Sequence, residues 1–174
     1  MSGYEIERKF LVKKGVDFKK KARCQYEIRQ GYIPSSEAAI RIRLRDNQAF
    51  LTIKGKKLTL LTRYEFETEI DFEEGQKLLQ MCKGLIIEKT RYLVDVGKHT
   101  FEIDEFHGLN EGLVVAEVEL QSEDEEIETP DFLGKEVTDD GKYANMNLMN
   151  FPYQIWKLKQ QQDEYIKNKQ NNNS

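Results

Sequence analysis

The stretch "YEIERKF", residues 4–10, alternates two kinds of side chain. Glu5, Glu7 and Lys9 occupy every second position, and the positions between them are mostly apolar. A period of two is typical of a β-strand, because successive side chains of a strand point to opposite faces. One face of this strand would therefore carry charge, and the other would be suited to a hydrophobic core.

The same alternation recurs along most of the chain. A single sheet with one solvated face would also produce it. Here, however, like charges adjoin on one face, as with Arg41 and Arg43, and such neighbours repel each other unless something binds between them. The repetition therefore indicates a cavity lined by charge. The other alternating segments are "AIRIRLR" (39–45), "FLTIKG" (50–55), "RYEFETEIDF" (63–72), "EKTRYLV" (88–94), "FEIDEF" (101–106) and "VAEVELQ" (115–121).

These segments predict about eight strands, which is enough to close a barrel with its polar face inward. We expect an α+β fold that is mainly β: an eight-stranded antiparallel closed β-barrel, or tunnel, with a charged interior and helices packed outside. Strands are predicted near 4–12, 25–33, 39–45, 48–54, 60–72, 86–96, 99–106 and 113–121. Helices are predicted around 16–22, 73–82, from about 143, and over about 152–168.

The chain of 174 residues suits one domain with a real core. We expect a tunnel domain over 1–151, then a C-terminal helix and a polar tail over 152–174. The tail ends in "NNNS", which is predicted to be disordered. The acidic run "EDEEIE", residues 123–128, is predicted to be a solvated loop.

Composition excludes several classes of protein. The net charge of −4 does not suggest a basic nucleic-acid binder. No apolar run is long enough to span a bilayer and no signal peptide is present, so we expect a cytoplasmic protein without a membrane partner. His99 and His107 are spaced for neither a zinc site nor a catalytic triad. Cys24 and Cys82 are expected to be buried, reduced thiols.

A polyphosphate is the ligand that needs both signs of charge in one cavity. Arginine and lysine bind its oxygens, and the hard cations Mg²⁺ or Mn²⁺ that neutralise it prefer carboxylates. The candidate basic wall consists of Lys9, Arg41, Arg43, Lys54, Lys89 and Arg91. The candidate acidic wall consists of Glu5, Glu7, Asp104, Glu117 and Glu119.

An ordered set of motifs gives the sequence a family resemblance. Glu5, Glu7 and Lys9 match an N-terminal ExExK signature. With the motifs that follow it, the sequence resembles CYTH-domain proteins of the triphosphate tunnel metalloenzyme superfamily over about residues 3–150, most of all the small bacterial inorganic triphosphatases. These motifs are "RQGYI" (29–33), "RIRLR" (41–45), "LTIKG" (51–55), "RYEFE" (63–67), "EKTRY" (88–92), "EIDEF" (102–106), "LVVAEVEL" (113–120) and "EVTDDGKYAN" (136–145).

The resemblance implies a metal-dependent hydrolase that cleaves a triphosphate inside the tunnel. Inorganic tripolyphosphate is the favoured substrate, with nucleoside and thiamine triphosphates as alternatives. It implies Mg²⁺ or Mn²⁺ on the acidic wall and phosphate on the basic wall. Glu65 and Glu67 could be metal ligands or could pair with the arginines. The implied catalytic residues are Lys9, Tyr32 and Lys89.

Two other functions stay open at this point. A class IV adenylate cyclase would use the same tunnel to make cyclic AMP from ATP, and nothing in the sequence shows or excludes a purine pocket. A non-catalytic polyphosphate- or nucleotide-binding module is the second alternative. The retained acids argue against it, since binding an anion needs bases more than carboxylates. A homodimer is also left open.

Overall fold

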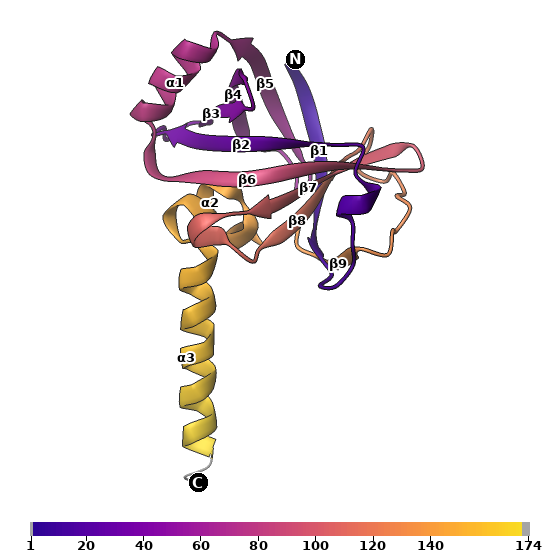
Figure 1. The fold of residues 1–174 in the computed structure, drawn as a ribbon, viewed down its shortest axis with the longest axis vertical. Coiled ribbons are helices and arrows are strands. Elements are labelled where there is room, and N and C mark those ends of the chain that lie inside the picture. The colour runs from indigo at the N-terminus through magenta and orange to yellow at the C-terminus, as the bar shows by residue number, and fades with distance from the viewer. Residues whose placement is uncertain (1, 172–174) are drawn as a thin grey trace.

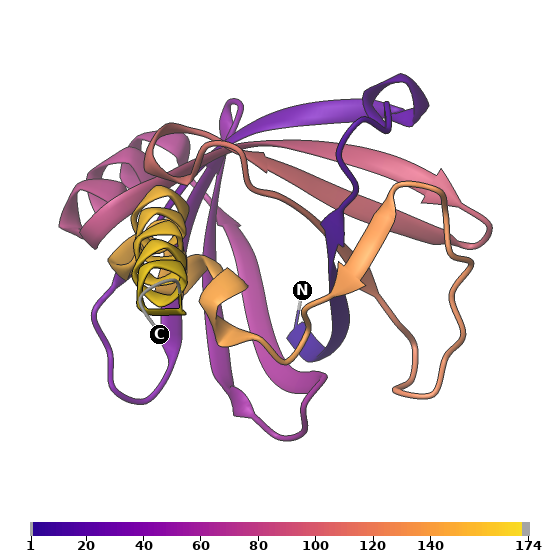
Figure 2. The same ribbon diagram turned by 90° about the horizontal axis from the view of Figure 1, so that it is seen from below.

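The computed structural model describes residues 2–171 of the chain. Within that range nine strands form one antiparallel sheet in the order β5-β4-β3-β2-β6-β7-β8-β1-β9, and β5 also pairs with β1. The extra pairing joins the two ends of the sheet, so β1 to β8 form a closed barrel (Figures 1 and 2). The strands are β1 Ser2–Val12, β2 Cys24–Ile33, β3 Ala39–Arg45, β4 Gln48–Lys57, β5 Thr62–Ile70, β6 Lys83–Val96, β7 His99–Phe106, β8 Val114–Glu119 and β9 Leu133–Glu136.

The barrel closes along β1, the strand with which the sequence analysis began. Its first half pairs with β5, with Glu5 opposite Arg63. Its second half pairs with β8, which sets Glu7 opposite Glu119 and Lys9 opposite Glu117. The charged row of β1 therefore spans the seam between two parts of the barrel.

Much of the hydrophobic core lies on the outer face of the barrel, because the inner face is charged. The positions of β6, β7 and β8 that alternate with the charged ones are buried, such as Val94, Phe101 and Val118. They pack against the segments that precede β2 and β9, including Phe18 and Phe132. The alternation in the sequence is thus confirmed, with charge inside and apolar side chains outside.

Helix α1 covers the outer face of β3 and β4. It begins after Asp71, whose carboxylate accepts a hydrogen bond from the backbone N–H of Glu74 at 3.1 Å, an N-cap that satisfies one free donor. Leu79 of this helix packs with Leu44 and Ala49. The helices are α1 Phe72–Met81, α2 Asn145–Asn150 and α3 Tyr153–Asn171, with short 3₁₀ turns η1 Lys19–Lys21, η2 Gly108–Asn110 and η3 Gly141–Tyr143.

Helix α2 covers one end of the barrel interior. Ile87 and Phe106 follow the inward-facing rows of β6 and β7 and pack against Leu148 of α2. Helix α3 then leaves the body of the molecule (Figure 1). Trp156 in its first turns is buried, whereas Leu158 and Tyr165 are exposed. Within residues 2–171, no helix is long and apolar enough to cross a membrane.

Some local predictions of secondary structure were wrong. The helix expected over 16–22 is only the single turn η1, and the short strand β9 was not predicted. The predicted disorder of "NNNS" falls, from position 172 on, outside the described residues. The division at 151 and 152 stays a prediction.

Two predictions about side chains also need correction. The acidic run is not merely solvated, since Glu125 forms an ion pair with Lys98 at 2.6 Å and lies 3.1 Å from Nε2 of His99. Cys24 and Cys82 are free thiols as expected, but both are partly exposed rather than buried.

Candidate functional site

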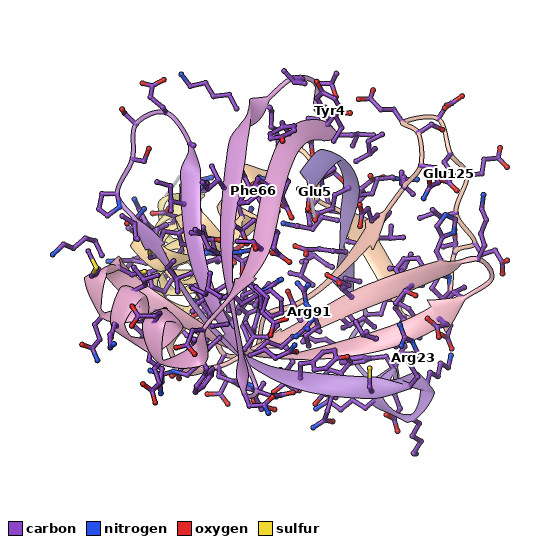
Figure 3. All side chains as sticks on the ribbon, turned by 90° about the horizontal axis from the view of Figure 1, so that it is seen from above. Tyr4, Glu5, Arg23, Phe66, Arg91 and Glu125 are labelled. Carbon is purple, nitrogen blue, oxygen red and sulfur yellow. The ribbon has the colours of Figure 1, made fainter. Side chains whose placement is uncertain are left out.

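Three adjoining cavities run through the barrel, and we refer to them together as the tunnel. The basic chamber, of about 390 Å³, lies beneath the segment that leads into α2. The central chamber, of about 370 Å³, lies between β3, β5 and β8, and the acidic mouth, of about 500 Å³, lies beside β7 and β8. Glu5, Glu7 and Glu117 line all three cavities, so the three lie side by side around these carboxylates. Figure 3 shows Glu5 and Arg91 within the ring of strands.

The basic chamber gathers five of the six predicted phosphate-binding residues and the predicted tyrosine. Arg43 is the exception and lines the central chamber. The basic chamber also contains Lys57 and Arg63, which the sequence analysis did not single out. The five predicted basic residues are Lys9, Arg41, Lys54, Lys89 and Arg91, and the tyrosine is Tyr32.

Glu5 is held between two basic side chains. Lys54 Nζ lies 3.0 Å from both of its carboxylate oxygens, and Arg63 Nε lies 2.8 Å from one of them. Burial acts to raise the pKa of Glu5, but the charges of Lys54 and Arg63 outweigh it and lower the pKa to about 2. Lys54 also pairs with Glu65 at 2.5 Å. Glu5 is therefore ionised and already engaged.

Glu67 holds two arginines of β3 together. Arg41 and Arg43 each place a guanidinium nitrogen 3.0 Å from its carboxylate, and Thr52 donates a hydrogen bond to it at 2.7 Å. The two arginines repel each other, and Glu67 offsets that repulsion. Of the two roles left open for Glu65 and Glu67, pairing with bases is the one that the geometry favours.

Asp104 is fully buried between Lys89 and Arg91. Lys89 Nζ lies 2.6 Å from one carboxylate oxygen, and Arg91 binds both oxygens through a fork at 2.6 and 2.7 Å. Lys89 also donates a hydrogen bond to Oδ1 of Asn145, the first residue of α2, at 3.1 Å. Burial and the charge of Arg91 lower the pKa of Lys89 to about 8, although Asp104 acts against them. Asp104, predicted as a metal ligand, does not line these three cavities.

Four carboxylates crowd at the junction of the chambers. Lys9 bonds Glu117 at 2.9 Å but lies 3.9 Å from Glu7. Burial and the neighbouring charge of Glu117 raise the pKa of Glu7 to about 7. Burial, followed by the charge of Glu5, also raises the pKa of Glu119. The basic side chains near Glu7 and Glu119 therefore do not balance the negative charge of the carboxylates there.

This imbalance of charge suits a divalent cation, and carboxylate oxygens are the donors that Mg²⁺ and Mn²⁺ prefer. Among the described residues, no three acidic, histidine or cysteine side chains converge into a complete cage for a metal ion. A complete cage is not required, because Mg²⁺ in phosphate-binding sites uses one or two carboxylates together with water and substrate oxygens. The donor set therefore fits a cation that arrives with a phosphate ligand.

Replacing Glu7 with glutamine should change how the stability of the metal-free protein depends on pH. The folded pKa of Glu7, about 7, exceeds the ordinary value of 4.5, so the folded state holds the proton more tightly than the unfolded state. Wild-type stability should therefore fall as pH rises from 5 to 8, by on the order of 2–3 kcal/mol from this group. A glutamine side chain cannot ionise, so the fall should be smaller in Glu7→Gln. Urea unfolding in a chelator measures both, and parallel curves would contradict the expectation.

The residues that the sequence analysis missed fall into two kinds. Arg63 and Glu102 each lie two residues before a predicted inward residue of β5 or β7, so a strict period-two pattern would have found them. Arg63 pairs with Glu5 and Glu102 pairs with Arg91. Asn145 lies at the start of α2, where no periodic pattern indicates that its side chain reaches Lys89.

Residues 3–145 match the model of the CYTH domain. A protein of Acetivibrio thermocellus named inorganic triphosphatase is 41% identical over 157 residues, covering 89% of this chain and 99% of that protein. A second inorganic triphosphatase, from Nitrosomonas europaea, is 36% identical, with coverages of 83% and 95%. The crystal structure of the inorganic triphosphatase NE1496 superposes with a TM-score of 0.60 at 33% identity, covering 83% of this chain and 93% of that one.

Proposed function

The chain belongs to the CYTH domain family, and on this basis we propose that it is a divalent-metal-dependent hydrolase of inorganic tripolyphosphate. The observation that carries the proposal is the basic chamber. Seven lysine and arginine side chains line it, next to carboxylates that lack sufficient positive charge. The names of the two relatives support the choice of inorganic tripolyphosphate over other triphosphates.

In this proposal, the substrate lies along the basic chamber with its phosphates bound by the lysines and arginines. Arg41 and Arg91, together with Arg43 in the adjoining central chamber, offer planar forks that match phosphate oxygens, whereas Lys9 and Lys54 act as point charges. Each of these side chains is already oriented by a carboxylate. Binding therefore needs little ordering of the side chains, which reduces its entropic cost.

Glu7, Glu117 and Glu119 would hold the cation, with Glu5 as a fourth candidate. When bound, Mg²⁺ or Mn²⁺ would neutralise charge that develops on the phosphate oxygens. Asp104 would act differently from the metal ligand that the sequence suggested. It would hold Lys89 and Arg91 in place, because its carboxylate accepts hydrogen bonds from both of those bases.

Lys89 and Tyr32 are the proposed proton-handling residues. With a pKa of about 8, Lys89 can donate a proton from Nζ to the oxygen of the leaving phosphate near neutral pH. Burial raises the pKa of Tyr32, so its phenol stays protonated and can donate a hydrogen bond to the substrate. Gln30 donates a hydrogen bond to Tyr32 Oη at 3.2 Å and orients the ring.

The direct test incubates the protein with Mg²⁺ or Mn²⁺ and, in turn, tripolyphosphate, ATP and thiamine triphosphate, and identifies every product. We expect orthophosphate, released fastest from tripolyphosphate. Cyclic AMP from ATP would instead indicate the class IV adenylate cyclase. Binding without any product would indicate the non-catalytic module.

Asn145→Ala should lower kcat for tripolyphosphate by roughly tenfold with a smaller change in KM. The alanine removes the acceptor that helps to aim Lys89, but Asp104 still holds the ammonium group. Asn147→Ala, two residues along and also beside the chamber, is the matched control. Steady-state kinetics measures both variants. Equal effects of the two substitutions would contradict a specific role for Asn145.

Tripolyphosphate and Mg²⁺ together should raise Tm by several degrees, more than the sum of their separate effects. Each would neutralise the wall of the tunnel that the other leaves charged. A ligand that binds only the folded state at a hundred times its Kd adds about 2.7 kcal/mol. Thermal unfolding of the Asn145→Ala variant, in which turnover should be slower, would measure this against sodium sulfate at matched ionic strength. Additive shifts would count against a shared site.

A further inference from the structure

Strand β4 contains a β-bulge where it passes the basic chamber. On the neighbouring strand β5, Glu65 is opposite Lys54. Two residues earlier on β5, Arg63 is opposite Lys57, so three steps along β4 match two steps along β5. One extra residue of this kind reverses the face to which the following side chains point. Without the bulge, the alternation that places Lys54 inside the barrel would have placed Lys56 inside as well.

The bulge brings Lys57 to the chamber and leaves Lys56 outside it. Lys57 is one of the residues that line the basic chamber, and Lys56 is not. Nζ of Lys56 instead pairs with Glu37 at 3.3 Å, and both of these side chains are largely exposed. Bulges beside functional sites commonly redirect a side chain in this way. Here the irregular pairing adds one positive charge to the chamber.

The charge of Lys57 is not neutralised by a carboxylate. In the described part of the chain, the other six basic residues of the chamber each form an ion pair with a carboxylate, and Lys57 forms none. Nζ of Lys57 donates a hydrogen bond to the backbone carbonyl oxygen of Leu60 at 2.8 Å, within the same hairpin. This bond uses one of the three N–H donors of the ammonium group, so two remain for an anion.

The surroundings of Lys57 favour an anion beside it. Burial, followed by the positive charges of Arg63 and Lys9, lowers the pKa of Lys57. The charges of Glu7 and Asp139 act in the opposite direction, but neither carboxylate forms an ion pair with Lys57 among the described residues. A bound anion at this position would offset the repulsion among the three basic side chains.

Lys57 lies at the outer rim of the basic chamber, where it is exposed together with Asp139. Glu7 and Glu117 line the inner end of the chamber, where the three cavities adjoin. The inference rests on the proposed function, in which the cation and the bond to be cleaved lie beside these inner carboxylates. The phosphate group that reaches Lys57 is then the one at the far end of the triphosphate.

The far phosphate is the group that differs between inorganic and organic triphosphates. In tripolyphosphate it is a terminal phosphate, which carries about −1.5 to −2 charges near pH 7. In ATP it is the α-phosphate, which is esterified to the ribose and has a single ionisable oxygen. A lysine that is not neutralised therefore gains more from the terminal phosphate than from the esterified one.

We propose that Lys57 is a specificity-determining residue, which binds the far phosphate of inorganic tripolyphosphate and so favours this substrate over ATP. The basic residues deeper in the chamber bind phosphate groups that the two substrates share. They raise the affinity for both substrates, whereas specificity is the difference between the two affinities. The bulge in β4 thus supplies the residue that distinguishes an inorganic triphosphate from a nucleoside triphosphate.

The test measures the binding of sodium tripolyphosphate and of ATP by isothermal titration calorimetry, in a chelator that prevents metal-dependent hydrolysis. Lys57→Gln should weaken the binding of tripolyphosphate about tenfold, the lower end for a charge-assisted hydrogen bond, because Lys57 is exposed. It should weaken the binding of ATP by less than about threefold. Lys56→Gln is the matched control, because it removes the same charge from the adjacent position outside the chamber. This control should change neither affinity.

Each outcome decides the proposal. A larger loss of affinity for tripolyphosphate than for ATP in Lys57→Gln, without such a loss in Lys56→Gln, supports it. Equal losses for the two ligands, no loss, the same loss in both variants, or no binding of tripolyphosphate to the wild type overturns it. Circular dichroism checks the fold of each variant, and Lys57→Ala removes the same charge should Lys57→Gln not fold.

The proposed function is judged by a separate measurement, the release of orthophosphate from tripolyphosphate by the wild type with Mg²⁺. If the wild type releases none, the proposed function fails, and the calorimetric affinities still decide the role of Lys57. If it releases orthophosphate and Lys57→Gln weakens both ligands equally, the proposed function stands and the role of Lys57 is wrong.

Discussion

Replacing Glu117 with glutamine should lower kcat for tripolyphosphate by at least about a hundredfold. Glu117 lines all three cavities of the tunnel and bonds Lys9 at 2.9 Å and Arg91 at 3.3 Å. Burial acts to raise its pKa, but Lys9 and Arg91 hold it well below the usual range, so Glu117 is ionised. Glutamine keeps the shape and loses the negative charge that both the bases and a cation would use.

The control for Glu117→Gln is Glu136→Gln, which removes a carboxylate that pairs with Arg8 on the outside of the barrel. That variant should keep its activity. Thermal unfolding separates loss of chemistry from loss of fold, and Mn²⁺ binding followed by electron paramagnetic resonance reports on the cation site without turnover. Activity within about threefold of wild type at saturating Mg²⁺ would show that Glu117 is not part of the reaction site.

Asp104→Asn should lower the free energy of unfolding by about 3–5 kcal/mol, because it leaves two buried cations without their shared carboxylate. Asp104 is 1% exposed, and its partners Lys89 and Arg91 are 2% and 8% exposed. Their mutual repulsion, which Asp104 now offsets, would then act in a poorly solvated interior. Urea unfolding at neutral pH measures the loss.

Asp95→Asn is the matched control on the same strand pair. Asp95 pairs with Arg23 at 2.9 Å, but both side chains are about half exposed. Such surface pairs contribute about 0–1 kcal/mol, so this variant should be nearly as stable as wild type. Similar losses of unfolding free energy in the two variants would mean that the stabilisation by the Asp104 contacts does not depend on their burial.

The sequence predicted the barrel well because period-two patterning records which face of a strand is buried. Seven segments showed that pattern strongly, and each of them contains a strand in the structure. β9 was missed because it has only four residues and includes Gly134, where an added Cβ would lie 2.9 Å from the backbone oxygen of Leu11. That close approach is a tertiary feature with no local signature.

The charged residues that line the site were also predictable, but the ion pairs that they form with one another were not. Periodicity placed Glu5 and Lys54 on inward faces, and only the closure of β1 on β5 brings them within 3.0 Å. The same closure adds Arg63 to the pair. These cross-strand distances determine which carboxylates pair with basic side chains and which remain available to a metal ion. The sequence could therefore identify the charged residues of the interior, but it could not assign each carboxylate to one of these two roles.

The paired interior has a consequence for selectivity. Lys9, Lys54 and Arg91 each already have a carboxylate partner within 3.0 Å. An anion that enters the tunnel must exchange these internal ion pairs for its own, so it gains only the difference. A chain of phosphates replaces many pairs at once, whereas a single orthophosphate replaces few and would be displaced as the carboxylates return. The carboxylates of the tunnel thus compete with every bound phosphate for the same basic side chains. This competition favours long, densely charged ligands and rapid release of the short product.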